Sequence, residues 1–577
     1  MGSSFGLVDF RGRPVDTRRH GGVRASMFIY IMVWLGNVVN IANSMNMVSY
    51  LRGTMNMGVA AAATTSTNFV AALQMFTAPA AFLADSYVKR FYTVLILAPG
   101  YILLAIQAHV PSLHPPACIV NEPHNCEPVH GTNLSLLLLG MYMICIGEGA
   151  IRACLPALGG DQFDNADPVE RRLESSFFNW YTFSVSMGSF FGLIFVVWLE
   201  NNKGWGVGFA VCAAIVLLGL LIWAAGFPFY RNQVSTGSPI TRIMQVIIVA
   251  CKKRNLKLPG NPEDLNQMSD DNAKGLEVLH RTEGLRFLDK AAIKTENGAR
   301  GPWSLRNVTQ VEETKIVCRM IPIFLTSAVG YMPVSIILNF TVQQGNTMDT
   351  RLGAISVSPA TLFVIPTVFQ LVILVVYDRL LVPLLRRATG YVGAVTHLQR
   401  IGVGFVAAVL ASAVAALVET RRKAVAEGSG LVDSPAGGVP MSVFWLTPQF
   451  FLLGVVDVTS FVGLLEFFYS EASAGMKSIG SSVFYCMLGL AAWFSTLLIQ
   501  LVNRATRRGD GAAGWLDGAN LNRSRLDSFY WLVCVLELVS FVVYLFWARR
   551  YVYMNDQRVA AEDDKKTIPS AAYVDGI

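Results

Sequence analysis

The 577-residue chain is 53% hydrophobic and only 15% charged, well below the roughly 25% of charged residues in an ordinary soluble domain. Its formal charge is +7, but the basic residues lie between apolar blocks and form no stripe with interleaved aromatics, so we expect no nucleic-acid partner. The composition therefore excludes a water-soluble protein and predicts an all-α membrane protein that has the lipid bilayer as its solvent.

Apolar blocks of membrane length recur along the chain. About 20 apolar residues in a helix match the hydrocarbon thickness of a bilayer, and residues 93–110 and 207–230 contain no Asp, Glu, Lys or Arg. The alternation of apolar blocks with polar breakers predicts twelve spans, near residues 27–50, 60–84, 92–110, 134–155, 176–199, 207–230, 314–340, 357–380, 398–419, 442–468, 478–501 and 527–548.

The widest gap between spans divides the chain into two halves. Two six-helix halves with a central cavity between them are typical of the major-facilitator fold. Residues 284–293 within the gap predict a short amphipathic helix that lies on the bilayer or on the underside of the bundle, or else a solvated linker helix. The expected organisation is an N-terminal tail (1–26), a six-helix bundle (27–230), a linker (231–313), a second six-helix bundle (314–548) and a C-terminal tail (549–577).

The distribution of Lys and Arg predicts that both tails and the linker are cytoplasmic. The first 26 residues contain no cleavable signal peptide, so we expect the first span to target the chain to the membrane. Two basic clusters would then face outward, and either extend helices beyond the bilayer or mark a wrong boundary. One outward loop would hold Asn522 as a glycosylation acceptor. Another would hold Cys118 and Cys126, which either form a disulfide or stay reduced. The outward basic residues are Arg421, Arg422, Lys423, Arg504, Arg507 and Arg508.

Signatures of catalysis are missing from the sequence. It has no phosphate-binding loop, no HExxH and no nucleophile elbow, so we expect no enzyme. The nine cysteines form no CxxC pair or metal-ligand spacing, and we expect neither a metal nor a cofactor.

The informative residues are therefore ionisable groups inside spans, each of which costs at least ~2.5–3.5 kcal/mol at the bilayer centre. Glu148 and Arg152 lie one helical turn apart and either neutralise each other, or Arg152 faces the central cavity and binds an anionic group. In the second alternative Arg152 exchanges partners with Asp457 during a transport cycle. Glu537, in the last span, is expected to be a structural hydrogen-bonding residue.

Other polar and aromatic residues in spans are candidates for a pocket. Asparagines recur every three residues in the first span and either hold helices together or line a cavity. We favour the cavity for Asn37 and Asn40, and helix packing for Asn46. The remaining candidates for substrate binding are Tyr331, Trp445 and Gln449.

Several segments carry a resemblance over nearly the whole chain, from about Gly21 to Tyr551. They include LADSYVKRFYT (83–93), GEGAIRACLPALGGDQFD (147–164), SSFFNWYTF (175–183) and GLLEFFYSEA (463–472). The chain resembles the plant nitrate transporter/peptide transporter family, within the proton-coupled oligopeptide transporter group of the major-facilitator fold. It looks most like the subfamily that includes abscisic-acid importers. By this resemblance Arg152 takes the place of a family lysine in span 4, and Asp457 that of its glutamate partner in span 10.

The departures from the family pattern limit what the resemblance implies. Proton-coupled members carry ExxER in span 1, where this chain has Val33, Gly36 and Asn37 at the three defining positions. Asp457 is then the main candidate for proton coupling, and coupling itself is doubtful. Val334 stands where the nitrate-binding member has a histidine, which argues against nitrate.

The expected function is a secondary transporter that moves an organic anion of the abscisic acid or gibberellin class by alternating access. We expect it in a plant plasma membrane rather than a vacuolar membrane. The alternatives are a non-transporting sensor or scaffold of the same family, or nitrate or peptides as substrates. The sequence gives no evidence on oligomeric state.

Overall fold

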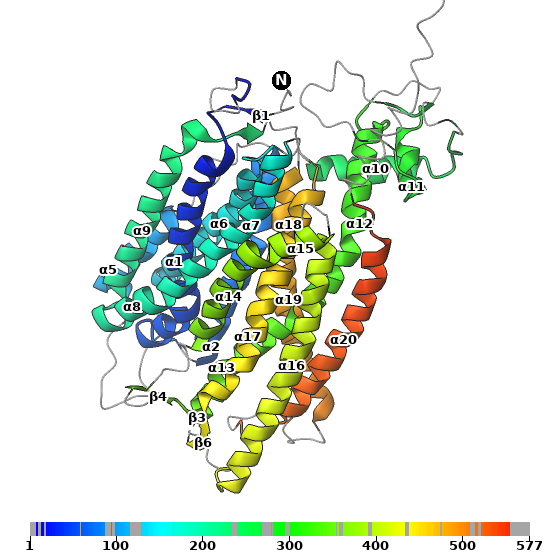
Figure 1. Cartoon of the computed structure of the whole chain (residues 1–577). Coiled ribbons are helices and arrows are strands. Elements are labelled where there is room, and N and C mark those ends of the chain that lie inside the picture. The colour runs from blue at the N-terminus through cyan, green and yellow to red at the C-terminus, as the bar shows by residue number, and fades with distance from the viewer. Residues whose placement is uncertain are drawn as a thin grey trace, which may run out of the picture.

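The computed structural model describes residues 7–553 except 10–12, 17–18, 58, 87–93, 95–97, 116–127, 165–166, 234–238, 260, 262–263, 268–278, 280, 295–300, 353–354, 357–361, 390–394, 433–437, 474–475, 508–513 and 517–520. Long helices run side by side through the molecule (Figure 1). We call the end of the bundle that carries the N-terminal tail and the linker the linker end. The opposite end carries the short strands β3 (Met348–Asp349) and β6 (Val439–Ser442), which pair in parallel.

The first half of the chain forms one group of helices. In α7 the start is set by Asp167, whose side chain accepts a hydrogen bond from the Val169 amide, and by Pro168 in the first turn. Helix α1 packs on α7 and α9, and α5 packs on α6 and α9. The elements are α1 (Gly22–Gly53), α2 (Val59–Met75), α3 (Thr77–Ser86), α5 (Ala98–His109), η2 (Pro111–Leu113), α6 (Gly131–Gly160), α7 (Pro168–Phe191), the π-helical turn η3 (Gly192–Val196), α8 (Val197–Lys203), α9 (Trp205–Ala225) and η4 (Phe227–Phe229).

The linker folds against the bundle at the linker end. Strand β1 (Leu7–Val8) pairs antiparallel with β2 (Asn232–Gln233). The linker helices are α10 (Pro239–Lys252), the single turn α11 (Arg286–Asp289) and the 3-10 turn η7 (Lys290–Ala292). Leu288, Ala291 and Ala292 are buried against α10, so the part of the expected amphipathic segment 284–293 that forms a helix packs within the folded linker, next to α12.

The second half forms another group, in which α16 packs on α17 and α20. Helix α16 begins at a capping box formed by Thr396 and Gln399. The elements are α12 (Val308–Gly330), α13 (Met332–Thr347), β4 (Arg351–Leu352), β5 (Ile355–Ser356), α14 (Val364–Val376), the π-helical turn η9 (Tyr377–Leu381), α15 (Val382–Thr389), α16 (His397–Gly428), η10 (Val443–Leu446), α17 (Thr447–Val456), the π-helical turn η11 (Asp457–Phe461), α18 (Val462–Glu471), α19 (Lys477–Thr506) and α20 (Leu526–Arg550).

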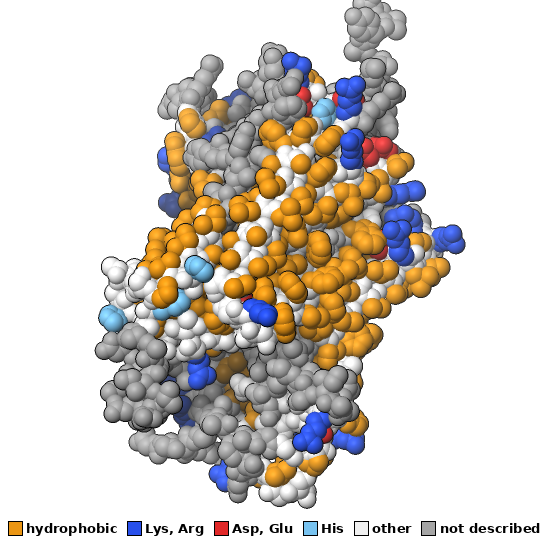
Figure 2. Space-filling view, turned by 90° about the vertical axis from the view of Figure 1, so that its left-hand side faces the viewer, with side chains coloured by type: hydrophobic (Ala, Val, Ile, Leu, Met, Phe, Trp, Pro, Cys, Tyr) orange, Lys and Arg blue, Asp and Glu red, His pale blue; other side chains and the backbone are white. Residues whose placement is uncertain are grey.

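The helices agree with the spans predicted from hydropathy. Within the described residues, eleven helices or helix runs are long and apolar enough to cross a membrane. Residues 92–93 and 95–97 of the third predicted span and 357–361 of the eighth lie outside the described residues, and α5 covers 98–109 of the third span. Hydrophobic side chains cover the middle of the face in Figure 2, and most charged side chains lie toward its ends, as expected of a surface in contact with lipid.

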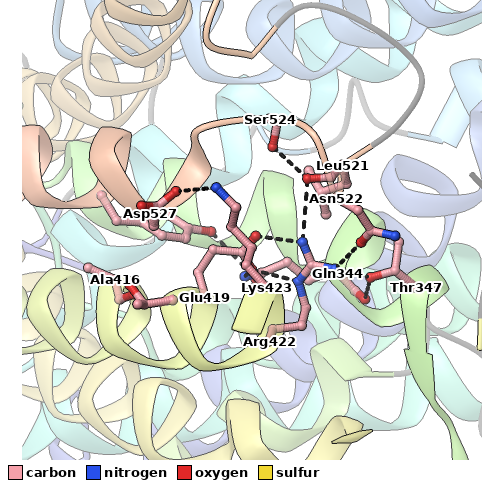
Figure 3. Close-up of polar contacts among 12 residues, drawn as sticks. Gln344, Thr347, Ala416, Glu419, Arg422, Lys423, Leu521, Asn522, Ser524 and Asp527 are labelled. Carbon is pink, nitrogen blue, oxygen red and sulfur yellow. Dashed lines mark hydrogen bonds and ion pairs between the residues drawn. The ribbon is translucent and has the colours of Figure 1, made fainter. Parts of the chain in front are cut away.

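A buried ion pair lies near the end of α16, at the opposite end of the bundle (Figure 3). Arg422 and Glu419 are both fully buried, and the two contacts between them measure 2.6 and 2.8 Å. Arg422 also donates to Thr347 Oγ1 at 3.0 Å and to Asn522 Oδ1 at 2.6 Å, and Gln344 donates to Glu419 at 2.8 Å. This network ties the end of α13, the end of α16 and the segment before α20 together.

The neighbouring basic residues of α16 also have partners. Lys423 Nζ lies 2.9 Å from Asp527 Oδ1, and the guanidinium of Arg421 lies 4.2 Å from the ring centre of Trp445. Helix α16 continues to Gly428, so these charges follow from a helix that extends past the predicted span end. Asn522 is buried and its amide also donates to the Leu431 carbonyl, so a glycan on Asn522 is incompatible with this packing. Cys118, Cys126 and Arg508 lie outside the described residues.

Candidate functional site

Arg152 lies on α6, among residues that are almost all buried. Its side chain is 16% exposed, and its Nε lies 3.8 Å from Oε2 of Glu148, one turn earlier on the same helix. Pro156, four residues later, lacks the N–H that would bond to the Arg152 carbonyl, and thereby loosens the helix at this point. The local ion pair, one of the two alternatives that the sequence left open, is present, but it occupies only one edge of the guanidinium.

Two amide side chains from other helices bind the remaining edge. Arg152 Nη1 donates to Gln74 Oε1 of α2 at 2.7 Å, and Nη2 donates to Asn40 Oδ1 of α1 at 3.1 Å. The ring centre of Tyr485, on α19 of the second half, lies 5.5 Å from the guanidinium carbon, within range of a cation–π contact. Arg152 thus lies where the two halves meet, with Glu148 beside its Nε and neutral amide oxygens bound to both Nη atoms.

A close helix contact positions Gln74. Helices α2 and α3 are separated at Phe76, since Pro79 cannot donate to the carbonyl of Met75. Gly149, on α6, faces this junction, and a Cβ atom there would lie 2.6 Å from the Phe76 carbonyl carbon. Only glycine therefore allows α6 to approach closely enough for Gln74 to reach Arg152.

Asp457 occupies a separate polar position in the second half. It is half-buried at the start of the π-helical turn η11 and accepts a hydrogen bond from the Tyr331 hydroxyl. Tyr331 lies at the junction of α12 and α13, where Pro333 begins the second helix. Arg152 and Asp457 both belong to the part of the chain that the structure describes. They form no ion pair with each other in this conformation.

The other predicted pocket residues lie apart from Arg152 or bind elsewhere. Asn37 donates to the Val33 carbonyl of its own helix at 2.9 Å. Trp445 is 44% exposed at the opposite end, beside Arg421. Gln449 is fully buried, and neither polar atom of its side chain has a hydrogen-bond partner among the described residues.

The structure agrees with the expectation for Asn46 and disagrees with the expectation for Glu537. Asn46 donates to Glu200 Oε2 at 2.8 Å and joins α1 to α8, in line with the favoured packing role. Glu537 is buried and, within the described part of the chain, neither carboxyl oxygen has a hydrogen-bond partner. The expected hydrogen-bonding role of Glu537 is therefore wrong for this conformation.

Hydrogen bonds join the two halves near the linker end. Asp378, on η9, accepts from Ser176 at 3.1 Å, from Asn179 at 2.9 Å and from the Trp180 indole at 3.1 Å, all on α7. Arg400, at the start of α16, donates to Asn179 Oδ1 at 2.8 Å. The segment SSFFNWYTF therefore supplies one side of a contact between the halves.

A second pair of contacts involves the other conspicuous motifs. Tyr469 of α18 donates to Asp161, in the DQFD segment, at 3.1 Å. The amide of Ile479, at the start of α19, donates to Asp85 of the LADS segment at 3.0 Å. The motifs singled out in the sequence thus lie at the junction of the halves, at their linker ends.

Sequence reasoning missed Gln74 and Tyr485 beside Arg152, and Asp378 between the halves. Asp378 falls two residues from the end of a predicted span, so it was not counted among intramembrane charges, although its position next to an apolar run is a usable signal. Gln74 and Tyr485 are single polar residues in spans and carry no spacing pattern. Among the described residues, no group of three or more His, Cys, Asp and Glu side chains lies where it could hold a metal ion.

The comparisons with known proteins agree on one family. The model of the POT family matches residues 90–516. Protein NRT1/PTR family 4.5 of Arabidopsis thaliana is 38% identical over 558 residues, covering 95% of this chain and 97% of that protein. Protein NRT1/PTR family 4.6 of the same plant is 37% identical over 574 residues, with the same coverage.

Solved structures show the same architecture. Crystal structures of an auto-inhibited POT family peptide transporter and of the POT family transporter PepTSo each give a TM-score of 0.58 and 16% identity, over 92% of this chain and 98% of the other. At this identity the likeness establishes the fold alone, and it confirms the predicted all-α membrane fold. The chain is therefore a multi-pass membrane transporter that belongs to the POT family, within its NRT1/PTR branch.

Proposed function

We propose that this transporter carries an organic anion, of the class of abscisic acid or gibberellin, across a plant plasma membrane by alternating access. The observation that carries the proposal is the guanidinium of Arg152, which lies between the halves with both Nη atoms bonded to neutral amide oxygens. A carboxylate matches the guanidinium fork in geometry and adds charge, so it binds more strongly than amides do.

The arrangement around Arg152 explains how a substrate carboxylate fits beside Glu148. Glu148 approaches Arg152 through Nε at 3.8 Å, whereas Asn40 and Gln74 take the Nη atoms. A substrate that displaces the two amides binds the far edge of the guanidinium and does not compete directly with Glu148. Tyr485 then offers an aromatic face beside the bound group, which suits an organic rather than an inorganic anion.

Proton coupling, where present, falls to Asp457 in this proposal. The positions of the family's ExxER motif hold Val33, Gly36 and Asn37, and Asn37 is bonded to its own helix, so none of them takes up a proton. Asp457 lies in the second half and accepts a hydrogen bond from the Tyr331 hydroxyl. The protein is then either a facilitator or a carrier whose coupling depends on Asp457.

Alternating access requires the contacts of Asp378 with α7 to break. We place the linker end in the cytoplasm because it carries the basic linker. Opening toward the cytoplasm then separates Asp378 from Ser176, Asn179 and Trp180.

The missing carboxylates of the first span also favour a second candidate function, a membrane sensor that binds the same anion without net transport.

The test is uptake of labelled abscisic acid, gibberellin and nitrate by oocytes, at acidic and at slightly alkaline external pH, with water-injected cells as the baseline. We expect saturable uptake of at least one hormone. Loss of hydrogen bonds to a charged group costs ~1.5–3 kcal/mol, so Arg152→Ala is expected to raise KM roughly tenfold or more. Arg504→Ala, at an exposed position near the end of α19, is the matched control.

The outcomes separate the two functions. If Arg152→Ala reaches the cell surface in equal amount and its uptake saturates with an unchanged KM, Arg152 is rejected as the anion-binding residue. Absence of uptake of all three compounds, together with saturable binding of a hormone to the purified protein, rejects transport and favours the sensor. Sensitivity of uptake to a protonophore, abolished in Asp457→Asn, assigns the coupling to Asp457.

A further inference from the structure

The linker helix α10 has two apolar faces, of which the inner one packs on the protein. Val246, Val249 and Ala250 are fully buried in a cluster with residues of α11, η7 and α12. Arg242 points the same way and lies 3.3 Å from Glu313 of α12. These contacts fix the rotation of α10 about its axis, so its outer face is defined.

The outer face of α10 is also apolar, yet it is exposed. Ile240 and Met244 are 44% and 49% exposed, and Cys251 is exposed as well. These residues are spaced by four and seven positions, which places them on one side of a helix. Half-buried Ile248 lies beside them, whereas half-buried Ile247 packs against the inner cluster. An apolar face that is turned away from the protein is typical of a surface that binds a partner.

Basic residues follow this face directly. Lys252, Arg254 and Lys257 are exposed, and the Lys252 ammonium lies 3.4 Å from the carbonyl of Trp303, itself 47% exposed. An apolar helix face that continues into a basic, aromatic cluster is suited to the boundary between lipid headgroups and acyl chains. The surface therefore has the two components that an anionic bilayer binds.

We propose that the outer face of α10 and the basic residues after it bind the anionic inner leaflet of the membrane. Helix α10 contacts α3 and α12 at the linker end, and in Figure 1 it lies at the side of the bundle near α12 rather than over its centre. The bilayer that surrounds the bundle is thus the nearest apolar surface. This inference rests on the cytoplasmic placement of the linker end in the proposed function.

The inference also changes which linker segment meets the membrane. The sequence singles out residues 284–293 as the amphipathic element, but Leu288, Ala291 and Ala292 are buried against α10. Helix α10 covers the inner side of that segment, while Leu285 and Phe287 stay exposed, and α10 presents an apolar face of its own outward. Because Arg242 pairs with Glu313 on α12, membrane binding by α10 would hold the linker to the second half.

The experiment uses the full-length protein in nanodiscs of phosphatidylcholine, with or without phosphatidylserine. A fluorophore on Cys251 is quenched either by nitroxide-labelled lipid or by acrylamide in water, and the signal of a Cys251→Ser protein is subtracted to remove labelling elsewhere. With phosphatidylserine we expect quenching by the lipid and protection from acrylamide. The triple variant Lys252→Gln, Arg254→Gln, Lys257→Gln is expected to lose the lipid quenching.

The control removes charges of the same kind from the opposite end, at exposed Lys203 and Arg504, as Lys203→Gln with Arg504→Gln. It is expected to keep the lipid quenching. Full quenching by acrylamide in nanodiscs with and without phosphatidylserine overturns the proposal. The outer face of α10 would then be a binding site for a cytosolic protein. Equal quenching by the nitroxide-labelled lipid in nanodiscs with and without phosphatidylserine overturns the proposal that α10 recognises anionic headgroups.

Hydrogen exchange of residues 240–257 in unlabelled protein repeats the comparison without a fluorophore. Protection that appears only with phosphatidylserine supports the proposal, and equal exchange in both lipids contradicts it. Neither measurement depends on transport, so failure of this inference and failure of the proposed substrate are distinguishable.

Discussion

Replacement of Arg422 by methionine tests the network at the opposite end of the bundle. The arginine makes two contacts with Glu419 and donates to Thr347 and Asn522, with every partner buried. Methionine keeps much of the volume but leaves the Glu419 carboxylate with Gln344 as its remaining partner in the network. Removal of one member of a buried ion pair costs about 3–5 kcal/mol, because the other charge stays buried and unpaired.

This free-energy loss converts into a large thermal shift. If the second half unfolds as a unit, each 1 kcal/mol lowers Tm by about 2–4 °C for 150–250 residues. We therefore expect Arg422→Met to lower Tm by about 6 °C or more. The measurement is thermal unfolding of the purified transporter in detergent, followed by binding of a thiol-reactive dye as buried cysteines become exposed.

Two comparison variants make the result interpretable. Lys423→Gln disrupts the more exposed contact with Asp527, and partly exposed pairs contribute about 0–1 kcal/mol, so its Tm is expected to change little. The double variant Glu419→Leu, Arg422→Met removes both charges and is expected to recover much of the loss. An Arg422→Met protein as stable as Lys423→Gln would refute the argument that the buried pair sustains this end of the fold.

Three further predictions concern the contacts between helices. Asp378→Asn weakens the charge-assisted bonds across the halves, each worth ~1.5–3 kcal/mol, so hydrogen exchange in α7 is expected to rise. Gly149→Ala places a Cβ atom against the backbone of the α2–α3 junction, so Gln74 is expected to lose its bond to Arg152 and KM for the transported anion to rise. Asn522→Gln removes the NRS acceptor but is expected to leave the glycosidase-sensitive mobility of the protein unchanged, since the Asn522 amide is buried.

The span pattern and the family could be predicted from the sequence because both depend on local signals. Membrane-length apolar blocks determine where helices cross, and intramembrane charges are rare enough to draw attention to Arg152 and Glu148. Asn40 was predicted as a pocket residue from its place in the asparagine stripe; it accepts a hydrogen bond from Arg152, and its role in a pocket stays a prediction. These predictions needed no knowledge of which helices are neighbours.

Predictions that depended on tertiary neighbours were less successful. Gln74 and Tyr485 reach Arg152 from α2 and α19, and no pattern along the chain brings these helices together. Trp445 was assigned to the pocket from its residue type, but its position beside Arg421 is set by the extension of α16 past the predicted span end. A residue type indicates what a side chain can bind, whereas helix packing decides whether it lies near the site.

The outward basic residues show why counting charges in loops is an incomplete guide to topology. The positive-inside rule concerns charges near the ends of spans, and it counts Lys and Arg without their partners. Arg422 is neutralised by Glu419 on its own helix, and Lys423 by Asp527 at the start of α20. Because each ion pair is neutral, neither cation adds net charge at the membrane surface. For these two residues the ion pairs make an outward position compatible with the orientation proposed from the basic linker, whereas Arg421 contacts the ring of Trp445 instead.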